Sequence, residues 1–296
     1  MMDGFLIMDK SPGMTSYDVI RRLKRIHPFK KIGYIGTLDR NATGILPVAL
    51  NEGVKLIPFL ENGEKRYVAK FVLGITTDTL DMEGKRLTDT EAPVFDASTL
   101  AEALQRFKGR IIQKIPVYSS KKIDGKPAYK WVRQGVAIDP PSKEVEVYDV
   151  RFVAYAHPFV DVEVSCSKGT YIRVIAHDFG AYLGCGAALH TLKRTRHGEF
   201  GLGARSVSID RLTTKQDVLE SLIPLQGVLQ TARGLTIDPV LEKFLKNGMP
   251  LPLLGGSRDW KDGELAKLLS KNGVLLGIGA VDTDSKTIKM KRLINS

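Results

Sequence analysis

Apolar residues recur at helical spacing in two segments that each follow a polar start signal. Thr15 is followed three residues later by Asp18, the spacing of a capping box, and an apolar stripe comes next: Ile20, Leu23 and Ile26. A second stripe follows Ser98 and Thr99: Leu100, Ala103, Leu104 and Phe107. We therefore expect one helix after Thr15 and another over 98–107, the second closed by Gly109 as its carboxyl-terminal cap.

Alternation of apolar and polar residues predicts strands in other segments. From Lys65 to Leu73 the pattern has a period of two, which predicts a strand with Tyr67 near its beginning. Residues 160–166 alternate in the same way, Lys168-Gly169-Thr170 breaks the pattern, and helical spacing then predicts a helix from residue 172. Residues 274–281 and 286–293 flank a turn-rich tetrapeptide and predict a hairpin in a small β domain.

The chain is basic and long enough for two domains. It has 296 residues, 43% hydrophobic and 26% charged, and no stretch reaches the roughly 18 apolar residues of a membrane span. Lysine and arginine number 44 against 33 aspartates and glutamates, a formal charge of +11 that favours a polyanionic partner. Two cysteines make no disulfide framework, and the amino terminus lacks the pattern of a secretory signal, so we expect a cytoplasmic protein.

One loop combines glycine with a carboxylate. Gly33, Gly36 and Gly44 surround Asp39, and glycine permits positive φ and close backbone approach, so this loop can present the carboxylate to a ligand. Spacing alone favours an Asx turn, in which Asp39 is structural. Lys168-Gly169-Thr170 resembles a phosphate nest at a helix start but lacks the glycine spacing of a P-loop.

Other catalytic classes find no support in the sequence. The five histidines are scattered without metal-ligand spacing, and no serine elbow or activated cysteine is present. From the residues alone, the chain is a basic, two-domain protein that binds nucleic acid, with a loop carboxylate as its candidate catalytic group.

Several separate motifs resemble those of the bacterial tRNA pseudouridine-55 synthase family (TruB type). Residues 33–44 resemble its catalytic loop, Gly-His-x-Gly-Thr-Leu-Asp-Pro-x-Ala-Thr-Gly, and depart from it at Tyr34 and Arg40. Lys65-Arg66-Tyr67 resembles the family's Lys-x-Tyr motif. Three further segments match in the family's order: 113–129 (QKIPVYSSKKIDGKPAY), 166–173 (CSKGTYIR) and 192–200 (LKRTRHGEF).

The resemblance implies an α+β fold in two domains. Residues 1–234 are expected to form a pseudouridine synthase catalytic domain on a mixed, mainly antiparallel sheet. Residues 235–296 are expected to form a small β-rich domain that resembles the RNA-binding PUA domain. The implied activity is isomerisation of one uridine in the T loop of tRNA. This reaction breaks N1–C1′ and joins C5 to C1′, so we expect no cofactor and no metal. We also expect a monomer without an obligate protein partner.

The same resemblance assigns four catalytic residues. Asp39 is the essential carboxylate, which either adds covalently to the nucleotide or assists glycal formation. Arg173 is expected to pair with Asp39 and keep it ionised. Tyr67 is expected to stack beneath the uracil and to take the C5 proton, and Tyr171 to fix the base or the Arg173 side chain.

The resemblance also implies RNA contacts, because the target uridine must leave its loop to reach a pocket. A basic insertion is expected to grip phosphates, and further contacts are expected around the site. The residues predicted to bind RNA are Lys121, Lys122, Lys126, Lys130, Arg133, Lys168, Arg194 and Tyr34. Tyr34 replaces the family's histidine; it can stack on an unpaired base, or it can simply pack the Gly33 to Gly36 turn.

Two other functions stay open on the sequence. One is a non-catalytic RNA-binding or RNA chaperone protein on the same fold, against which the intact Asp39, Tyr67 and Arg173 argue. The other is a glycosidase-like hydrolase that uses Asp39 with a second carboxylate, for which the sequence shows no clear acid partner.

Overall fold

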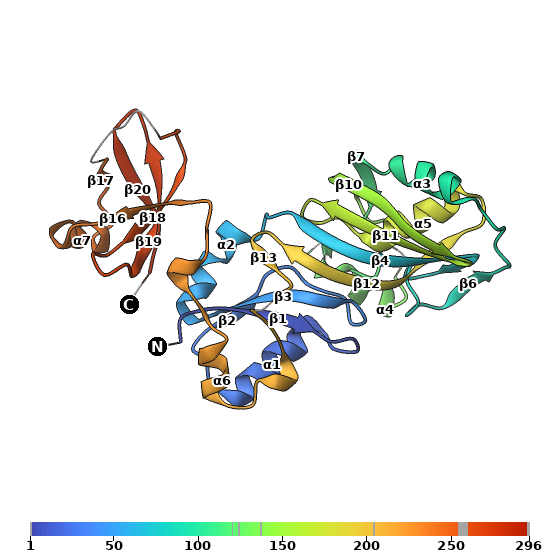
Figure 1. Cartoon of the computed structure of the whole chain (residues 1–296), viewed down its shortest axis with the longest axis horizontal. Helices are drawn as coiled ribbons and strands as arrows, with labels where there is room; N and C mark the ends of the chain where they lie inside the picture. The colour runs from blue at the N-terminus through green and yellow to red at the C-terminus, as the bar shows by residue number, and fades with distance from the viewer. Residues whose placement is uncertain are drawn as a thin grey trace.

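The computed structural model describes residues 2–119, 121–123, 125–136, 138–203, 205–253 and 260–294, with their side chains except those of Lys122, Tyr129, Arg133 and Lys246. These residues form one large sheet of eleven strands, a second sheet of five strands and two small hairpins (Figure 1). Among the helices of this described part, none has the length and apolar character needed to cross a membrane.

The main sheet has the strand order β14-β1-β3-β12-β4-β11-β10-β7, with β2, β13 and β15 paired at its margins. Its strands are β1 (Gly4–Lys10), β2 (Ile32–Tyr34), β3 (Thr43–Leu50), β4 (Lys65–Leu73), β7 (Gly109–Lys114), β10 (Ser142–Ala156), β11 (Phe159–Cys166), β12 (Ala187–His197), β13 (Phe200–Gly201), β14 (Ser206–Ser208) and β15 (Ile223–Pro224). Among the described strands of this sheet, only β1 with β14 and β3 with β12 pair in parallel. The predicted mixed, mainly antiparallel sheet is confirmed.

The two halves of the main sheet meet along a short seam between β3 and β12. The register there contains two residue pairs, Lys193 with Thr43 and Arg194 with Gly44. On the other side of β12, the pairing with β4 runs from Ala187 to His197. The seam therefore lies at the carboxyl-terminal end of the loop that carries Asp39, and β12 connects this loop to β4.

The helices are α1 (Ser16–Ile26), α2 (Ile57–Leu60), α3 (Ala97–Gln105), α4 (Ala128–Arg133), α5 (Ile172–Tyr182), α6 (Lys215–Glu220) and α7 (Pro239–Lys246). Short 3₁₀ turns cover Asn51–Leu56, Ile209–Arg211 and Leu225–Gly227. Helix α1 begins where the capping box predicts: the Asp18 amide donates to Thr15 Oγ1 at 3.1 Å, and the Thr15 amide donates to Asp18 Oδ2 at 2.8 Å.

The predicted strand over 65–73 and the predicted strand–turn–helix unit are both present. Along β4, Tyr67, Ala69 and Phe71 are buried and Arg66 and Val68 are exposed, as a period of two requires. Helices α3 and α5 cover this half of the sheet (Figure 1), where Phe179 of α5 packs on Phe71. The buried face of β4 thus points toward the same side as α5.

Helix α3 differs from the prediction at its end. It stops at Gln105, and Phe107 and Lys108 lie in a tighter turn whose amides donate to carbonyls three residues back. Gly109, predicted as the cap, is instead the first residue of β7, where its φ of +97° lets the chain leave the turn.

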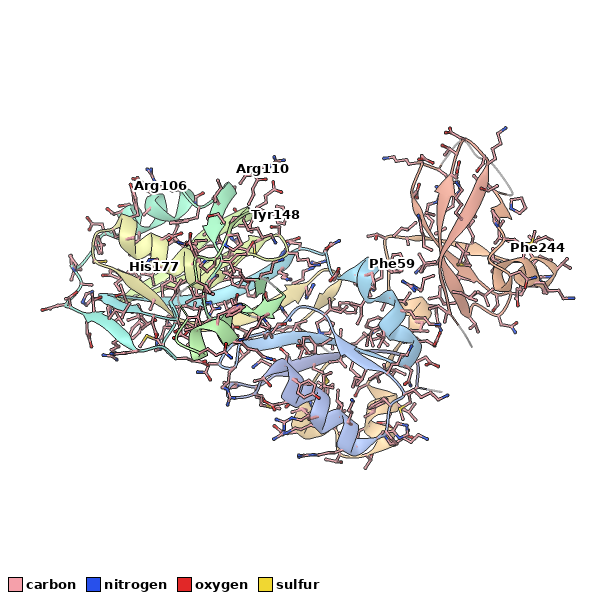
Figure 2. The ribbon with its side chains drawn as sticks, turned by 180° about the vertical axis from the view of Figure 1, so that it is seen from behind. Phe59, Arg106, Arg110, Tyr148, His177 and Phe244 are labelled. Atoms are coloured by element: carbon pink, nitrogen blue, oxygen red, sulfur yellow. The ribbon has the colours of Figure 1, made fainter. Side chains whose placement is uncertain are left out.

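The five-stranded sheet has the order β16-β18-β19-β20-β17. Its strands are β16 (Arg233–Thr236), β17 (Leu251–Pro252), β18 (Leu265–Leu269), β19 (Leu275–Asp282) and β20 (Thr287–Leu293), so the predicted hairpin is present. Apolar side chains at its base, Leu275, Ile278 and Ile294, join a buried cluster with Phe5 of the main sheet. Phe59 lies at this junction (Figure 2). Because β16 starts at Arg233 and belongs to the five-stranded sheet, we propose that the domain boundary lies just before Arg233, two residues before the expected division between residues 234 and 235.

Candidate active site

The loop that carries Asp39 connects β2 to β3, and residues of β1 and α1 hold its backbone by hydrogen bonds. The Ser16 hydroxyl, at the start of α1, accepts from the Leu38 amide at 2.9 Å and donates to the Leu38 carbonyl at 3.1 Å. Lys10 Nζ is buried and donates to the carbonyls of Ser11, Met14 and Arg40 at 2.7 to 3.0 Å. Leu38 is buried, whereas Asp39 beside it is exposed. The loop therefore presents its carboxylate to solvent from a fixed backbone.

Tyr67 lies in the centre of the sheet with its phenol buried. In the register of β4, it faces Val164 of β11 on one side and Arg194 of β12 on the other. Burial raises the pKa of Tyr67 to about 12; the Asp39 charge also raises it, whereas Arg194, by its charge and a hydrogen bond, lowers it. The Asp39 charge thus acts on the Tyr67 phenol, which is neutral at pH 7.

Tyr171 and Arg173 stand at the start of α5. The Gln113 side chain clamps Tyr171: its Oε1 accepts from the Tyr171 amide at 2.9 Å, and its Nε2 donates to the Tyr171 carbonyl at 3.2 Å. Burial raises the pKa of Tyr171, and the Asp39 charge adds to the rise. The Arg173 guanidinium lies 5.8 Å from the centre of the Tyr171 ring. These contacts fix the start of α5, where the Asp39 charge acts on Tyr171.

The predicted pair between Arg173 and Asp39 is not present. Arg173 is 5% exposed, and its Nη1 forms an ion pair with Asp81 Oδ2 at 3.4 Å. Its Nη2 donates to the Tyr118 carbonyl at 2.6 Å, and its Nη1 to the Thr79 carbonyl at 3.4 Å. The turn between β5 (Ile75–Thr77) and β6 (Arg86–Asp89) places Asp81 against the guanidinium, so this carboxylate is its ion partner.

Sequence reasoning missed two carboxylates in this turn. Asp81 and Glu83 line the same small cavity as Asp39, with a volume of about 40 Å³. The pKa of Glu83 is raised, first by partial desolvation and then by the charges of Asp81 and Asp39. The acidic, glycine-ended run from Asp78 to Gly84 between two strands was the sequence signal available. Glu83 is a carboxyl group disposed to hold a proton beside Asp39.

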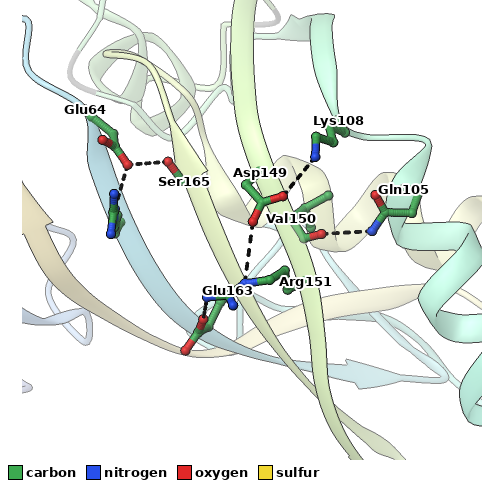
Figure 3. A network of polar contacts seen from close by, with 9 residues as sticks. Glu64, Gln105, Lys108, Asp149, Val150, Arg151, Glu163 and Ser165 are labelled. Carbon is green, nitrogen blue, oxygen red and sulfur yellow. Dashed lines mark hydrogen bonds and ion pairs between the residues drawn. The ribbon is translucent and has the colours of Figure 1, made fainter.

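A larger groove, which shares no lining residue with this cavity, has a different character. It measures about 680 Å³ and is lined by Tyr67, Tyr148 and charged side chains of β4, β10 and β11. Figure 3 shows those charges satisfied by each other: Glu64 accepts from Ser165, and Arg151 pairs with Asp149 and Glu163. Because its acidic and basic groups are paired, this groove lacks the excess positive charge that attracts a polyanion.

Seven of the eight residues predicted to bind RNA fall into three groups. Lys121 and Lys130 are exposed near the small hairpin of β8 (Lys122–Ile123) and β9 (Lys126–Pro127); the side chains of Lys122 and Arg133 are outside the described part. Two more have partners in the chain: Lys126 lies 4.2 Å from the Trp131 ring centre, and Lys168 pairs with Glu61 at 2.9 Å. Tyr34 ends β2 half-buried against the main core.

The prediction that Arg194 binds RNA is wrong. Its side chain is 0% exposed on β12, beneath the Asp39 loop, and it donates to backbone carbonyls of that loop and of β3. A basic residue can reach phosphates only from the surface. Arg194 and its neighbour His197 therefore belong to the support of the loop.

His197 predicts a pH dependence of stability. It is fully buried, and burial together with the Arg194 and Lys65 charges lowers its pKa to about 3. The unfolded chain takes up a proton near pH 6.5 and the native state does not. Acidification below pH 6.5 should therefore lower the free energy of unfolding by up to about 1.4 kcal/mol per pH unit from this group.

Urea unfolding of the wild type and of His197→Gln at pH 7, 6 and 5 measures this contribution. We expect the variant to lose less stability on acidification, by about 1 kcal/mol per pH unit. His190→Gln, at an exposed position, is the matched control. Equal slopes for all three proteins would show that His197 takes up its proton in the native state.

Comparison with known proteins identifies relatives over nearly the whole length. Residues 24–172 match the model of "TruB family pseudouridylate synthase (N terminal domain)". The chain is 41% identical to tRNA pseudouridine synthase B of Syntrophus aciditrophicus, with 94% of this chain and 90% of the relative covered. It is 35% identical to the protein of the same name from Clostridium tetani, with 93% and 91% covered.

Solved structures show a similar fold. The structure of an H/ACA RNP bound to a substrate RNA containing 2′-deoxyuridine aligns with a TM-score of 0.75 at 21% identity, covering 100% of this chain and 86% of the other. An archaeal Nop10–Cbf5 complex aligns with a TM-score of 0.73 at 22% identity, covering 99% and 86%. The alignments extend over both sheets of the present chain.

Proposed function

The chain belongs to the TruB family of pseudouridylate synthases, and on this premise we propose that it converts one uridine in the T loop of tRNA, at position 55, into pseudouridine. Relatives at 33–44% identity carry the name tRNA pseudouridine synthase B. The observation that supports the assignment most directly is the exposed Asp39 on a loop held by buried hydrogen bonds, with its charge acting on Tyr67 and on Tyr171 at the start of α5.

The proposed reaction is an intramolecular transfer. The N1–C1′ bond breaks, the detached uracil turns in place, and C5 joins C1′; the proton leaves C5 and N1 gains one. Asp39 acts either by covalent addition to the nucleotide or by assisting glycal formation. Both routes use an ionised, accessible carboxylate on a fixed backbone.

Tyr67 is the proposed proton acceptor at C5, but its environment limits how it can act. A phenol with a pKa of about 12 is protonated at neutral pH, so it can accept the C5 proton only by passing its own proton on, and N1, which gains a proton in the reaction, is the acceptor that balances the step. The Arg194 charge lowers the pKa of Tyr67 and so favours the release of that proton. The ring itself is suited to stack against uracil.

Arg173 stays in the proposed catalytic set with a changed partner. It holds Asp81, which lines the cavity of Asp39, and it binds the carbonyl of Tyr118 at the root of the basic insertion. Arg173 thus ties the α5 start, the Asp81 turn and the insertion together. We propose that Tyr171, clamped by Gln113, forms the wall of the base pocket at this point.

RNA binding is proposed to rest on charge and stacking. The net charge of +11 attracts tRNA, and phosphate contacts by exposed residues of the insertion, Lys121 and Lys130 among them, offset the cost of extruding the uridine, a few kcal/mol. Tyr34 keeps its proposed role of stacking on an RNA base, and its half-buried ring also packs against the main core.

Residues 235–296 are proposed to act as a PUA-like RNA-binding domain. We further propose a cytoplasmic monomer that needs no partner protein.

The decisive experiment incubates the purified chain with a T-stem-loop RNA and analyses the nucleosides and the free bases. We expect pseudouridine at position 55 without release of uracil. Free uracil would instead indicate a hydrolase, for which Glu83 beside Asp39 could serve as acid. RNA bound but unmodified would indicate the non-catalytic alternative.

A further inference from the structure

Arg194 is a buried cation whose contacts are all with the framework of the proposed site. Its Nε donates to the Ile45 carbonyl at 2.7 Å, its Nη2 to the Gly36 carbonyl at 2.8 Å, and its Nη1 to the Thr37 carbonyl at 3.4 Å. Within the described residues it forms no ion pair with a carboxylate. A buried charge without a counterion costs several kcal/mol, so stability alone gives little reason for an arginine here.

The contacts of Arg194 connect two separate parts of the site. Gly36 and Thr37 precede Asp39 by three and two residues in the loop between β2 and β3. Tyr67 lies on β4, where it is the register partner of Arg194, and the Arg194 charge lowers the pKa of its phenol. One planar side chain thus holds the backbone before Asp39 from the strand position that is paired with Tyr67.

The space around this guanidinium is tightly filled. Gly36 has a φ of +68°, and a Cβ atom there would lie 2.7 Å from His197 Cε1 and 3.2 Å from Arg194 Nη1. The loop can therefore rest on Arg194 and His197 only because residue 36 has no side chain. His197 stays neutral at this position, which avoids a second positive charge beside Arg194.

We propose that Arg194 is a positioning residue for the isomerisation: its guanidinium fork holds the Asp39 loop and the Tyr67 phenol in one mutual arrangement, without touching the RNA. This inference rests on the proposed function, since it concerns the same site. It predicts that disturbing the fork slows the chemical step and leaves RNA affinity unchanged. A residue that only stabilises the fold would lower activity in proportion to the folded fraction.

Arg194→Lys tests the fork while keeping the charge. One ammonium group cannot reproduce the planar set of donors. We expect the single-turnover rate at saturating T-stem-loop RNA to fall about 100-fold, the loss that a displacement of about 1 Å causes at a catalytic site. The dissociation constant for the RNA should stay within about threefold. Arg196→Lys, an exposed arginine two residues further along β12, is the matched control and should keep the wild-type rate.

Gly36→Ala disturbs the contact between the loop and Arg194 from the side of the loop. It tests the positioning role of Arg194 if Arg194→Lys does not fold. Its control is Gly184→Ala, at a turn after α5 with a φ of +75° and no atom within 4 Å of the added Cβ. Both substitutions carry a similar backbone strain, but only the first pushes the loop away from Arg194. We expect Gly36→Ala to lose rate at unchanged RNA affinity, and Gly184→Ala to lose only thermal stability.

Melting temperatures and rates measured together separate the outcomes. A wild-type rate in folded Arg194→Lys, or a rate loss equal to its loss of folded protein, would overturn the proposal. So would equal rates for the two alanine variants. If the wild type itself forms no pseudouridine, the proposed function fails first, and the role of Arg194 in that reaction fails with it.

Discussion

Asp39→Asn is expected to bind T-stem-loop RNA as tightly as the wild type and to form pseudouridine at a rate lower by about 10⁴- to 10⁶-fold, the range seen when a catalytic group of this kind is removed. The reason is structural as well as chemical. The loop is held by its backbone, through Ser16, Lys10 and Arg194, so the substitution removes a charge without releasing the loop. Single-turnover kinetics and fluorescence anisotropy with a labelled stem-loop measure the two quantities.

Asp210→Asn provides the matched control for this experiment. Asp210 is an exposed carboxylate that pairs with Arg22 far from the Asp39 loop in sequence, and its substitution should leave the rate unchanged. If Asp39→Asn retained a rate within tenfold of the wild type, Asp39 would be the structural Asx-turn residue that the loop spacing also allows, and the proposed chemistry would need another carboxylate. Glu83 would then be the first to examine.

The second large effect is expected for Tyr67→Phe, with a rate lower by about 10²- to 10⁴-fold, the usual contribution of general acid–base catalysis. The phenylalanine ring keeps the stacking surface, so RNA affinity should change little. The ring also keeps its place in the core, so the melting temperature should change little.

Tyr155→Phe is a suitable comparison, because its hydroxyl bonds with His157 and the Phe95 amide at the far end of β10. It should change stability slightly and the rate not at all. An unchanged rate in Tyr67→Phe would exclude the phenol as the acceptor of the C5 proton and leave the ring with a packing role alone.

Local patterns predicted the parts of the site that belong to single elements. The capping box at Thr15, the alternation along β4 and the strand–turn–helix unit at Lys168 depend on neighbours within a few residues, and all three are present. The loop of Asp39 was recognisable because glycine spacing and a family motif coincide there. Such signals are readable without knowing what packs against them.

The errors concern residues whose role depends on contacts distant in sequence. Arg194 looked like one more surface cation, but β12 lies between β3 and β4, and this position buries the side chain. The partner of Arg173 could not be predicted either. Asp81 is 92 residues away and reaches the guanidinium only because the β5–β6 turn folds over the site. Residue type gives the chemistry available, whereas topology decides which groups meet.

The narrow seam between β3 and β12 has a consequence for how the protein responds to heat. Asp39 belongs to one half of the main sheet and Tyr67 to the other, and two residue pairs link the halves along the ladder. Local opening of a short ladder requires less free energy than global unfolding. Inactivation should therefore precede the loss of secondary structure on heating. The amides of the seam should likewise exchange their hydrogens with solvent sooner than those along the β4–β11 ladder.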